Sequence, residues 1–324
     1  MKIRRLLISL VMPCGAAAAI TSCDGVTSGP PNGTGADAHS IPAHPRRWRP
    51  APPAVRAEVY VTQANGAADG VVFAYGAQNK SDRPPQCAVT GQKFDHSQIA
   101  TDASGNLYSP NLETGAINVY RPHCGSLIAS VTDPYGADID VAVYGPTFYG
   151  VGYTHVAVCS TSGCTSELTD RSIRQLETAA VDSGGNVWAS YYDLKGATSL
   201  IVWPHGAMPG KRVKGYVNPN TPGDLEFDAA GRLLSLQTLF THLYVYHCVA
   251  SAATCKNTRI VNLHGGTLFG TLNAKNTDYQ AADYSANAVD VYAYPSFKYE
   301  YSYSNGLMSG YSVQGIAQAP APSP

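Results

Sequence analysis

The sequence predicts an all-β fold, a six-bladed β-propeller of four-stranded antiparallel blades, and three observations support it. The composition favours strands and turns, because Gly (31), Pro (22) and Tyr (21) are abundant among the 324 residues. A strand–turn–strand unit with an Asp-x-x-Gly turn recurs at intervals of 40 to 46 residues. A short apolar strand recurs in step with that turn.

The first 22 residues have the layout of a secretory signal peptide. A basic start with Lys2, Arg4 and Arg5 precedes an apolar run over residues 6–11, and small residues follow it. The apolar run is too short to cross a bilayer as a stable helix. We therefore expect residues 1–22 to direct export and then to be removed.

The signal ends in Ile20-Thr21-Ser22-Cys23, an aliphatic residue, two small residues and a cysteine. This segment resembles the lipobox of bacterial lipoproteins, with Ile in place of the usual Leu and Thr in place of the usual Ala. The resemblance implies cleavage before Cys23 and lipidation of its sulfur, which would anchor the chain in the bacterial cell envelope on the extracytoplasmic side. An ordinary signal peptide with a chance cysteine is the alternative, and inner and outer membrane both stay open.

Residues 23–56 are rich in Gly, Pro, Thr and Ala and lack apolar periodicity. Such a segment cannot bury enough apolar surface to offset the entropy of ordering it. We therefore expect a disordered tether that carries a propeller over residues 57–319, with a disordered tail at 320–324. The formal net charge of −1 excludes a basic field for nucleic acid.

The most regular part of the repeat is a turn that starts with Asp and contains Gly. In such a turn the carboxylate accepts hydrogen bonds from backbone N–H groups two residues on, and Gly supplies a positive φ. We therefore predict structural turns, with ion binding by the Asp side chains as the alternative. The three best copies are Asp102-Ala-Ser-Gly105-Asn106, Asp182-Ser-Gly-Gly185-Asn186 and Asp228-Ala-Ala-Gly231-Arg232, and weaker copies fall at 139–142, 270–273 and 315–318.

A second series, of short apolar strands, has the same period and makes six units. Each unit would be a small antiparallel sheet that cannot bury both faces alone, so neighbouring sheets must stack and close into a ring. The strands of this series are 70–75, 117–120, 155–158, 200–203, 243–246 and 289–292.

The two ends of the repeat series complement each other. The copy at 315–318 has no strands after it, whereas the first unit, which starts at residues 58–61, has no inner strand before it. We expect the C-terminal strand to join the first blade as its innermost strand and so to close the ring without an exposed edge.

The Asp-x-x-Gly-Asn turn, the aromatic strand after it and a later Val-Tyr pair resemble the NHL-type propeller repeat. The resemblance covers about residues 57–319, with three units that match well and three that match in outline. It implies a propeller scaffold, and because such scaffolds host unrelated activities, function must be argued from a site. The sequence contains no Gly-x-Ser-x-Gly turn, His-Glu-x-x-His motif or Gly-rich phosphate loop.

Six cysteines lie in the repeats, and an even number in an exported domain indicates disulfides. Within the repeat frame, two pairs each flank the turn between a third and a fourth strand. The remaining two cysteines would meet across adjacent blades if they pair. A zinc site is the alternative for the closest pair, but no His lies in register with it. The pairs are Cys159 with Cys164, Cys248 with Cys255, and Cys87 with Cys124.

The loops that lead into the inner strands should ring one mouth of the central channel with polar residues. This ring leans acidic, so it could bind Ca²⁺, another divalent ion or a hydroxylated ligand, although no cofactor is predicted from a motif. Hydrogen bonds to channel water and loop backbone are the alternative role. The candidates are His96, Gln98, Tyr135, Asp138, Glu177, Asp224, Glu226 and Gln314.

An aromatic run from Phe297 to Tyr303 alternates with polar residues on the last outer strand. One face of that strand is therefore aromatic. We expect it to pack against the neighbouring blade, and a sugar-stacking or partner-docking surface is the alternative.

Two functions fit these observations. The first is a lipid-anchored binding or scaffold module without catalytic activity, a monomer that presents a rigid surface to a protein or glycan partner. The second is a propeller hydrolase or lyase with a polar, metal-assisted site at the channel mouth. The lack of a recognisable nucleophile or metal-ligand motif in the sequence favours the first.

Overall fold

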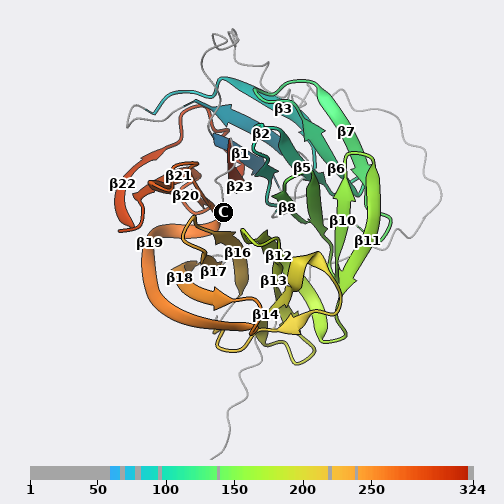
Figure 1. Ribbon diagram of the computed structural model, residues 1–324. Coiled ribbons are helices and arrows are strands. Elements are labelled where there is room, and N and C mark those ends of the chain that lie inside the picture. Colours follow the sequence, from blue (N-terminus) through green and yellow to red (C-terminus); the bar gives the residue numbers. More distant parts are fainter. Residues whose placement is uncertain are drawn as a thin grey trace, which may run out of the picture. The chain divides into compact units, whose positions relative to one another are not determined.

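The computed structural model consists of antiparallel sheets arranged around a central space (Figure 1). It describes residues 59–65, 70–76, 82–93, 97–136, 139–217, 221–237 and 240–319, which all belong to one compact unit. The only helix among these residues is a 3₁₀ turn, η1 (Pro204–Gly206), and no helix in this part is long and apolar enough to cross a membrane. The fold is all-β, as the composition predicts. The predicted signal peptide, Cys23, the tether and the tail lie outside the described residues.

Four of the five sheets have four strands each. The first has the order β23 (Ser312–Gln318), β1 (Val59–Ala64), β2 (Gly70–Tyr75), β3 (Cys87–Gln92). The second contains β4 (Ala100–Thr101), β5 (Leu107–Asn111), β6 (Ala116–Tyr120) and β7 (Leu127–Thr132). The third contains β8 (Asp140–Tyr144), β9 (Thr147–Val151), β10 (His155–Ser160) and β11 (Gly163–Thr169). The fourth contains β12 (Ile173–Val181), β13 (Val187–Asp193), β14 (Thr198–Trp203) and β15 (Lys211–Arg212).

The fifth sheet has seven strands, so the predicted count of six separate four-stranded blades is not confirmed. Its strands are β16 (Pro222–Phe227), β17 (Arg232–Gln237), β18 (Phe240–Val249), β19 (Thr254–Leu272), β20 (Asp278–Asp283), β21 (Ala288–Ala293) and β22 (Lys298–Tyr303). The cause is β19, which runs for 19 residues without interruption. It pairs with β18 mainly through its first half and with β20 through its second.

The C-terminal strand lies where the sequence predicts it. β23 pairs antiparallel with β1 from Val59 opposite Gln318 to Ala64 opposite Ser312. Val313 and Ile316 on β23 are fully buried. The two ends of the described chain are therefore held in one sheet.

Apolar side chains on facing sheets form the core. Trp203 and Tyr191 of the fourth sheet pack with Val151 of the third in one cluster. On the opposite face of the fourth sheet, Trp188 packs with Phe227, and their ring centroids are 5.7 Å apart. Strand alternation places successive side chains on opposite faces, so each strand supplies two neighbouring clusters.

The Asp-x-x-Gly segments are structural turns, as predicted. Asp102 Oδ1 accepts hydrogen bonds from the backbone N–H groups of Ser104 (2.8 Å) and Asn106 (2.9 Å), and Gly105 has a φ of 80°. Asp182 and Asp228 accept the equivalent pairs of bonds in their own turns. The same local sequence has therefore produced the same turn three times.

All three predicted disulfides are present. Cys159–Cys164 and Cys248–Cys255 each join two paired strands at a turn. The third bond, Cys87–Cys124, joins the first sheet to the segment after β6 of the second. It is therefore a covalent link between two sheets.

Candidate functional site

The inner strands surround a central channel with a cavity volume of about 130 Å³. Residues of β4, β8, β12, β16, β19 and β23 form its wall. Of the residues predicted for the channel mouth, Gln98, Asp224 and Glu226 lie in this wall. Asp140 on β8 also lies there and was not predicted.

Each of these four side chains accepts a hydrogen bond from the backbone of another inner strand. Every inner strand except β19 is the edge of its sheet, and residues 270–272 of β19 pair with β20 alone, so these segments carry backbone N–H groups that no neighbouring strand satisfies. The polar side chains therefore fasten neighbouring sheets together around the channel. The bonds run from Ile316 N to Gln98 Oε1 (2.9 Å), from Ala179 N to Asp140 Oδ2 (2.9 Å), from Gly270 N to Asp224 Oδ2 (2.9 Å) and from Leu272 N to Glu226 Oε2 (2.8 Å).

Burial shifts the ionisation of these carboxyl groups. It raises the pKa of Asp140 to about 6 and that of Glu226 to about 8, against the opposing effect of their hydrogen bonds. Burial, with added repulsion from Asp140 and Glu226, also raises the pKa of Asp224 well above its usual value. Glu226 is therefore mainly protonated at neutral pH, and the same effects favour the neutral form of Asp224.

Glu177 lies on β12 but is not among the residues that line the channel. Burial raises its pKa to about 7, and Gln175 Nε2 donates a hydrogen bond to Glu177 Oε1 at 2.7 Å. A neighbour on the same strand thus engages its carboxyl group, and it does not join the channel carboxylates.

The other predicted mouth residues have separate surroundings. Tyr135 is 44% exposed, and the edge of its ring contacts His155, with ring centroids 5.7 Å apart. Gln314 is buried on β23 and its side chain donates to Ser312 Oγ (3.0 Å). His96 and Asp138 lie outside the described residues. The predicted ring is therefore only partly a single site.

The aromatic run, which starts at Phe297 just before β22 and continues along that strand, is used mainly for packing. Phe297 and Tyr303 are buried, and Tyr301 packs against an apolar cluster shared with the first sheet. Tyr299 is 40% exposed, and its ring stacks on His264 with centroids 4.8 Å apart. The packing interpretation holds for the buried rings, and Tyr299 remains on the surface.

Five of the twelve exposed large apolar side chains among the described residues lie in one set of connections. We call this surface the loop face and define it by the connections between sheets and those between the second and third strands of a sheet. Alternating strand directions bring these connections to the same end of the sheets. Its exposed apolar residues are Tyr135, Tyr153, Leu194, Val217 and Tyr284, at 40 to 69% exposure.

No family model and no curated protein matches the chain. Solved structures do match: a chain of a nidogen/laminin complex is 14% identical with a TM-score of 0.61, over 81% of this chain and 99% of that one. A luciferin-regenerating enzyme is 12% identical with a TM-score of 0.51, over 64% and 76% of the two chains. Hydrazine synthase of Kuenenia stuttgartiensis is 8% identical with a TM-score of 0.54, over 82% and 91%.

The fold is a β-propeller. These neighbours differ in what their names describe, and at such low identity the likeness concerns the fold alone. The NHL-type identity of the repeat stays a prediction. What the propeller does must be argued from its own channel and loop face.

Proposed function

We propose that the chain is a non-enzymatic binding module, a six-bladed propeller held at the bacterial cell envelope by a lipid on Cys23. Its loop face would dock a protein or glycan partner. The observation that carries this proposal is the presence of five exposed apolar side chains, three of them Tyr, in the connections of the loop face, because aromatic and aliphatic anchors are typical of binding interfaces.

The small size of the central channel argues against an enzyme active site there. Its volume of about 130 Å³ is below the roughly 300 to 1,000 Å³ of small-molecule pockets. The polar side chains in its wall already accept hydrogen bonds from neighbouring strands. The alternative function is a hydrolase or lyase. It rests on the raised pKa values of Asp140, Asp224 and Glu226.

The count of six blades rests on the inner strands and on the core. Six inner strands contribute to the channel wall. Six apolar clusters separate the sheets among the described residues, and one of them lies between β17–β18 and β20–β21 of the seven-stranded sheet. On this proposal β19 serves as the outer strand of one blade and the inner strand of the next.

Lipidation is tested by labelling with radioactive palmitate in a bacterial host that processes lipoproteins. We expect label on the wild-type chain and none on Cys23→Ser. Label that persists in Cys23→Ser, or is missing from the wild type, would contradict the proposed anchor.

Partner binding is tested by photo-crosslinking in the native cells, with a photoreactive amino acid at Tyr153 on the loop face. The control carries it at Met208, which is 50% exposed in the connection between β14 and β15 on the opposite side. We expect a discrete crosslinked product from position 153, weakened by Leu194→Ser, and none from position 208. Equal products from both positions, or no product from either, would overturn the loop-face proposal.

A further inference from the structure

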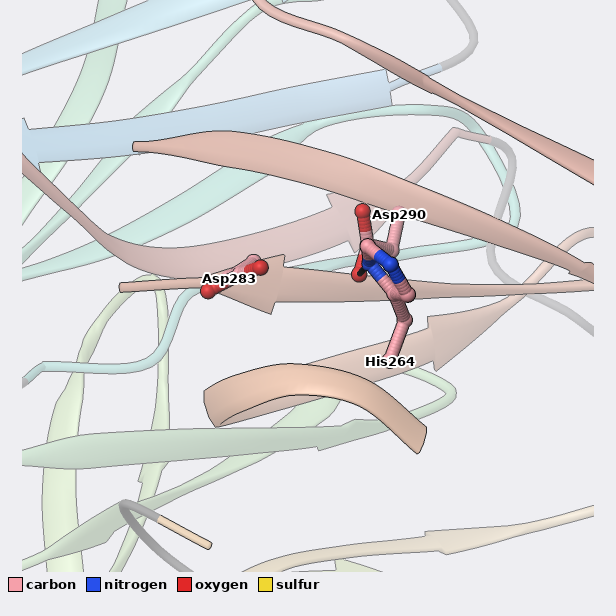
Figure 2. A group of neighbouring side chains, drawn as sticks. All are labelled: His264, Asp283 and Asp290. Carbon is pink, nitrogen blue, oxygen red and sulfur yellow. Dashed lines mark ion pairs between the residues drawn. The ribbon is translucent and has the colours of Figure 1, made fainter. Parts of the chain in front are cut away.

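Three metal-ligating side chains converge beside the loop face of the seven-stranded sheet. His264 lies on β19, Asp283 ends β20 and Asp290 lies on β21. One ligand atom from each lies within 4.8 Å of the others, and His264 Nδ1 is 3.7 Å from Asp290 Oδ2 (Figure 2). Both Asp residues are 1% exposed, whereas the His264 side chain is 65% exposed. The group is thus buried on its acidic side and open on the other.

In the fourth sheet the side chain of Arg212 lies at the equivalent positions. Asp193 ends β13 as Asp283 ends β20, and Ser199 occupies the register position on β14 that Asp290 occupies on β21. There Arg212 Nη2 donates to both Asp193 Oδ2 (3.1 Å) and Ser199 Oγ (2.8 Å). One negative charge is therefore matched by one positive charge.

The second sheet has neutral residues at these positions. Asn111 ends β5 and Asn118 on β6 lies opposite Ser109, in the same register. The seven-stranded sheet alone among the three places two buried carboxylates there. Among the described residues, His264 is the basic side chain found with them, and one imidazole can balance at most one of two negative charges. Burying unpaired charge is costly, so this arrangement fits a doubly charged ion.

Hydrogen bonds hold both carboxylates in place. Asp283 Oδ1 accepts from the backbone N–H groups of Ser285 (2.8 Å) and Ala286 (3.0 Å). Ser302 Oγ donates to Asp290 Oδ1, and the Tyr292 hydroxyl donates to Asp290 Oδ2 at 3.2 Å. Such outer partners orient metal ligands before the ion arrives.

A glycine brings β19 close to Asp283. A Cβ atom added at Gly265 would lie 1.8 Å from Asp283 Oδ2, so any other residue would displace the Asp283 carboxylate from this position. The residue before it is His264. The backbone at this point therefore sets the imidazole beside both carboxylates.

We propose that His264, Asp283 and Asp290 bind a divalent transition metal ion of the Zn²⁺ type, with one coordination position open to solvent. Imidazole nitrogen with carboxylate oxygens is a ligand set that such ions accept, and the nitrogen disfavours Ca²⁺ and Mg²⁺, which take oxygen ligands. The ion would supply the positive charge that Arg212 supplies in the fourth sheet. This inference does not depend on the proposed partner binding.

The test is a calorimetric titration of the oxidised full chain with Zn²⁺, compared with variants. We expect one Zn²⁺ per wild-type chain. Ser302→Ala, which removes a supporting bond, should weaken affinity by about 10- to 100-fold, and His264→Gln and Asp290→Asn should weaken it further. His247→Gln, which changes an exposed His on β18 of the same sheet, should leave the affinity unchanged.

A second readout separates loss of the ion from loss of the fold. Co²⁺ bound through the imidazole should give visible d–d absorption that His264→Gln lacks, while the far-UV circular dichroism of that variant stays the same. The proposal is overturned if the wild type binds no Zn²⁺, if His264→Gln binds it as tightly, if His247→Gln loses it equally, or if Ca²⁺ competes on equal terms.

Discussion

The carboxyl groups around the channel show how single residues serve the fold. Asp140, Asp224 and Glu226 lie at strand edges where backbone N–H groups would otherwise face the channel unpaired. A carboxyl oxygen satisfies such a donor, and burial then favours the neutral form of the acid. Proton uptake by these groups is thereby coupled to folding.

Stability should fall as pH rises from about 4.5 to about 8. The pKa of Glu226 is raised from 4.5 to about 8 in the folded chain, so the folded state binds more protons than the unfolded state in this window. The contribution of such a group to the free energy of unfolding is fully present below its pKa in the unfolded chain. Above that pH the contribution declines by up to about 1.4 kcal/mol per pH unit for each group. The pKa of Asp140, raised to about 6, acts in the same direction.

Urea unfolding of Glu226→Gln from pH 5 to 8.5 checks this. The variant should show a shallower decline and be more stable than the wild type at pH 8.5, because an amide keeps the acceptor for Leu272 N without a charge. Glu167→Gln, at an exposed position on β11, should keep the wild-type profile. A wild-type profile that is flat or rises over this range would contradict the assignment.

Repeat position was enough to predict some site residues and not others. Gln98, Asp224 and Glu226 could be assigned to the channel because they flank inner strands in the repeat. Asp140 had the same signal, a place on the inner strand of its unit, but Asp138 was predicted for that unit instead. His264 carries no local motif, since its proximity to Asp283 and Asp290 arises only from the pairing of β19, β20 and β21.

At the scale of elements, the Asp turns were predictable because all their determinants are local. The acceptor, the donors and the glycine of the first turn lie within five residues, so the sequence contains the whole hydrogen-bond pattern. Asp102 Oδ2 additionally accepts from the Asn106 side chain at 2.7 Å. Removal of this carboxylate should therefore lower the free energy of unfolding.

Asp102→Ala should lower the free energy of unfolding by about 2 kcal/mol, because backbone donors lose a charged acceptor. Asp102→Asn should cost less, since its amide oxygen can still accept from Ser104 and Asn106. Ser104→Ala should change stability by no more than about 0.5 kcal/mol, because its exposed side chain is not the acceptor of the turn. Urea unfolding of the three variants measures this. Wild-type stability in Asp102→Ala, or a Ca²⁺-dependent rise in melting temperature that this variant lacks, would favour the ion-binding alternative.

The disulfides should differ in what they contribute. Cys87 and Cys124 are 37 residues apart in sequence, whereas Cys159 and Cys164 are 5 apart. Closing the longer loop removes more entropy from the unfolded chain, about 4 kcal/mol against about 2 kcal/mol. The double Ser variant at Cys87 and Cys124 should therefore unfold at a lower denaturant concentration than the one at Cys159 and Cys164. The reverse order would contradict this expectation.

At the scale of the molecule, the period of the repeat predicted a ring of sheets but not how the sheets are joined. Turn motifs mark where strands reverse, and a Gly-Gly pair at 265–266 lies between the outer strand at Thr254 and the inner strand that ends at Leu272. β19 instead passes through both roles without a break. The local sequence therefore favours a break that the strand pairing does not show, so the seven-stranded sheet could not be foreseen.

Closure of the ring depends on β23, and its removal gives the last prediction. Truncation after Gly310 removes the strand that pairs with β1, together with the buried Val313 and Ile316, and leaves β1 as an open edge. We expect the truncated chain to lose cooperative unfolding in circular dichroism and to aggregate in size-exclusion chromatography. Truncation after Ala319, which removes only residues 320–324, should leave the melting temperature unchanged. If the longer truncation melts like the full chain, the first sheet does not need its C-terminal strand and the ring is not closed by it.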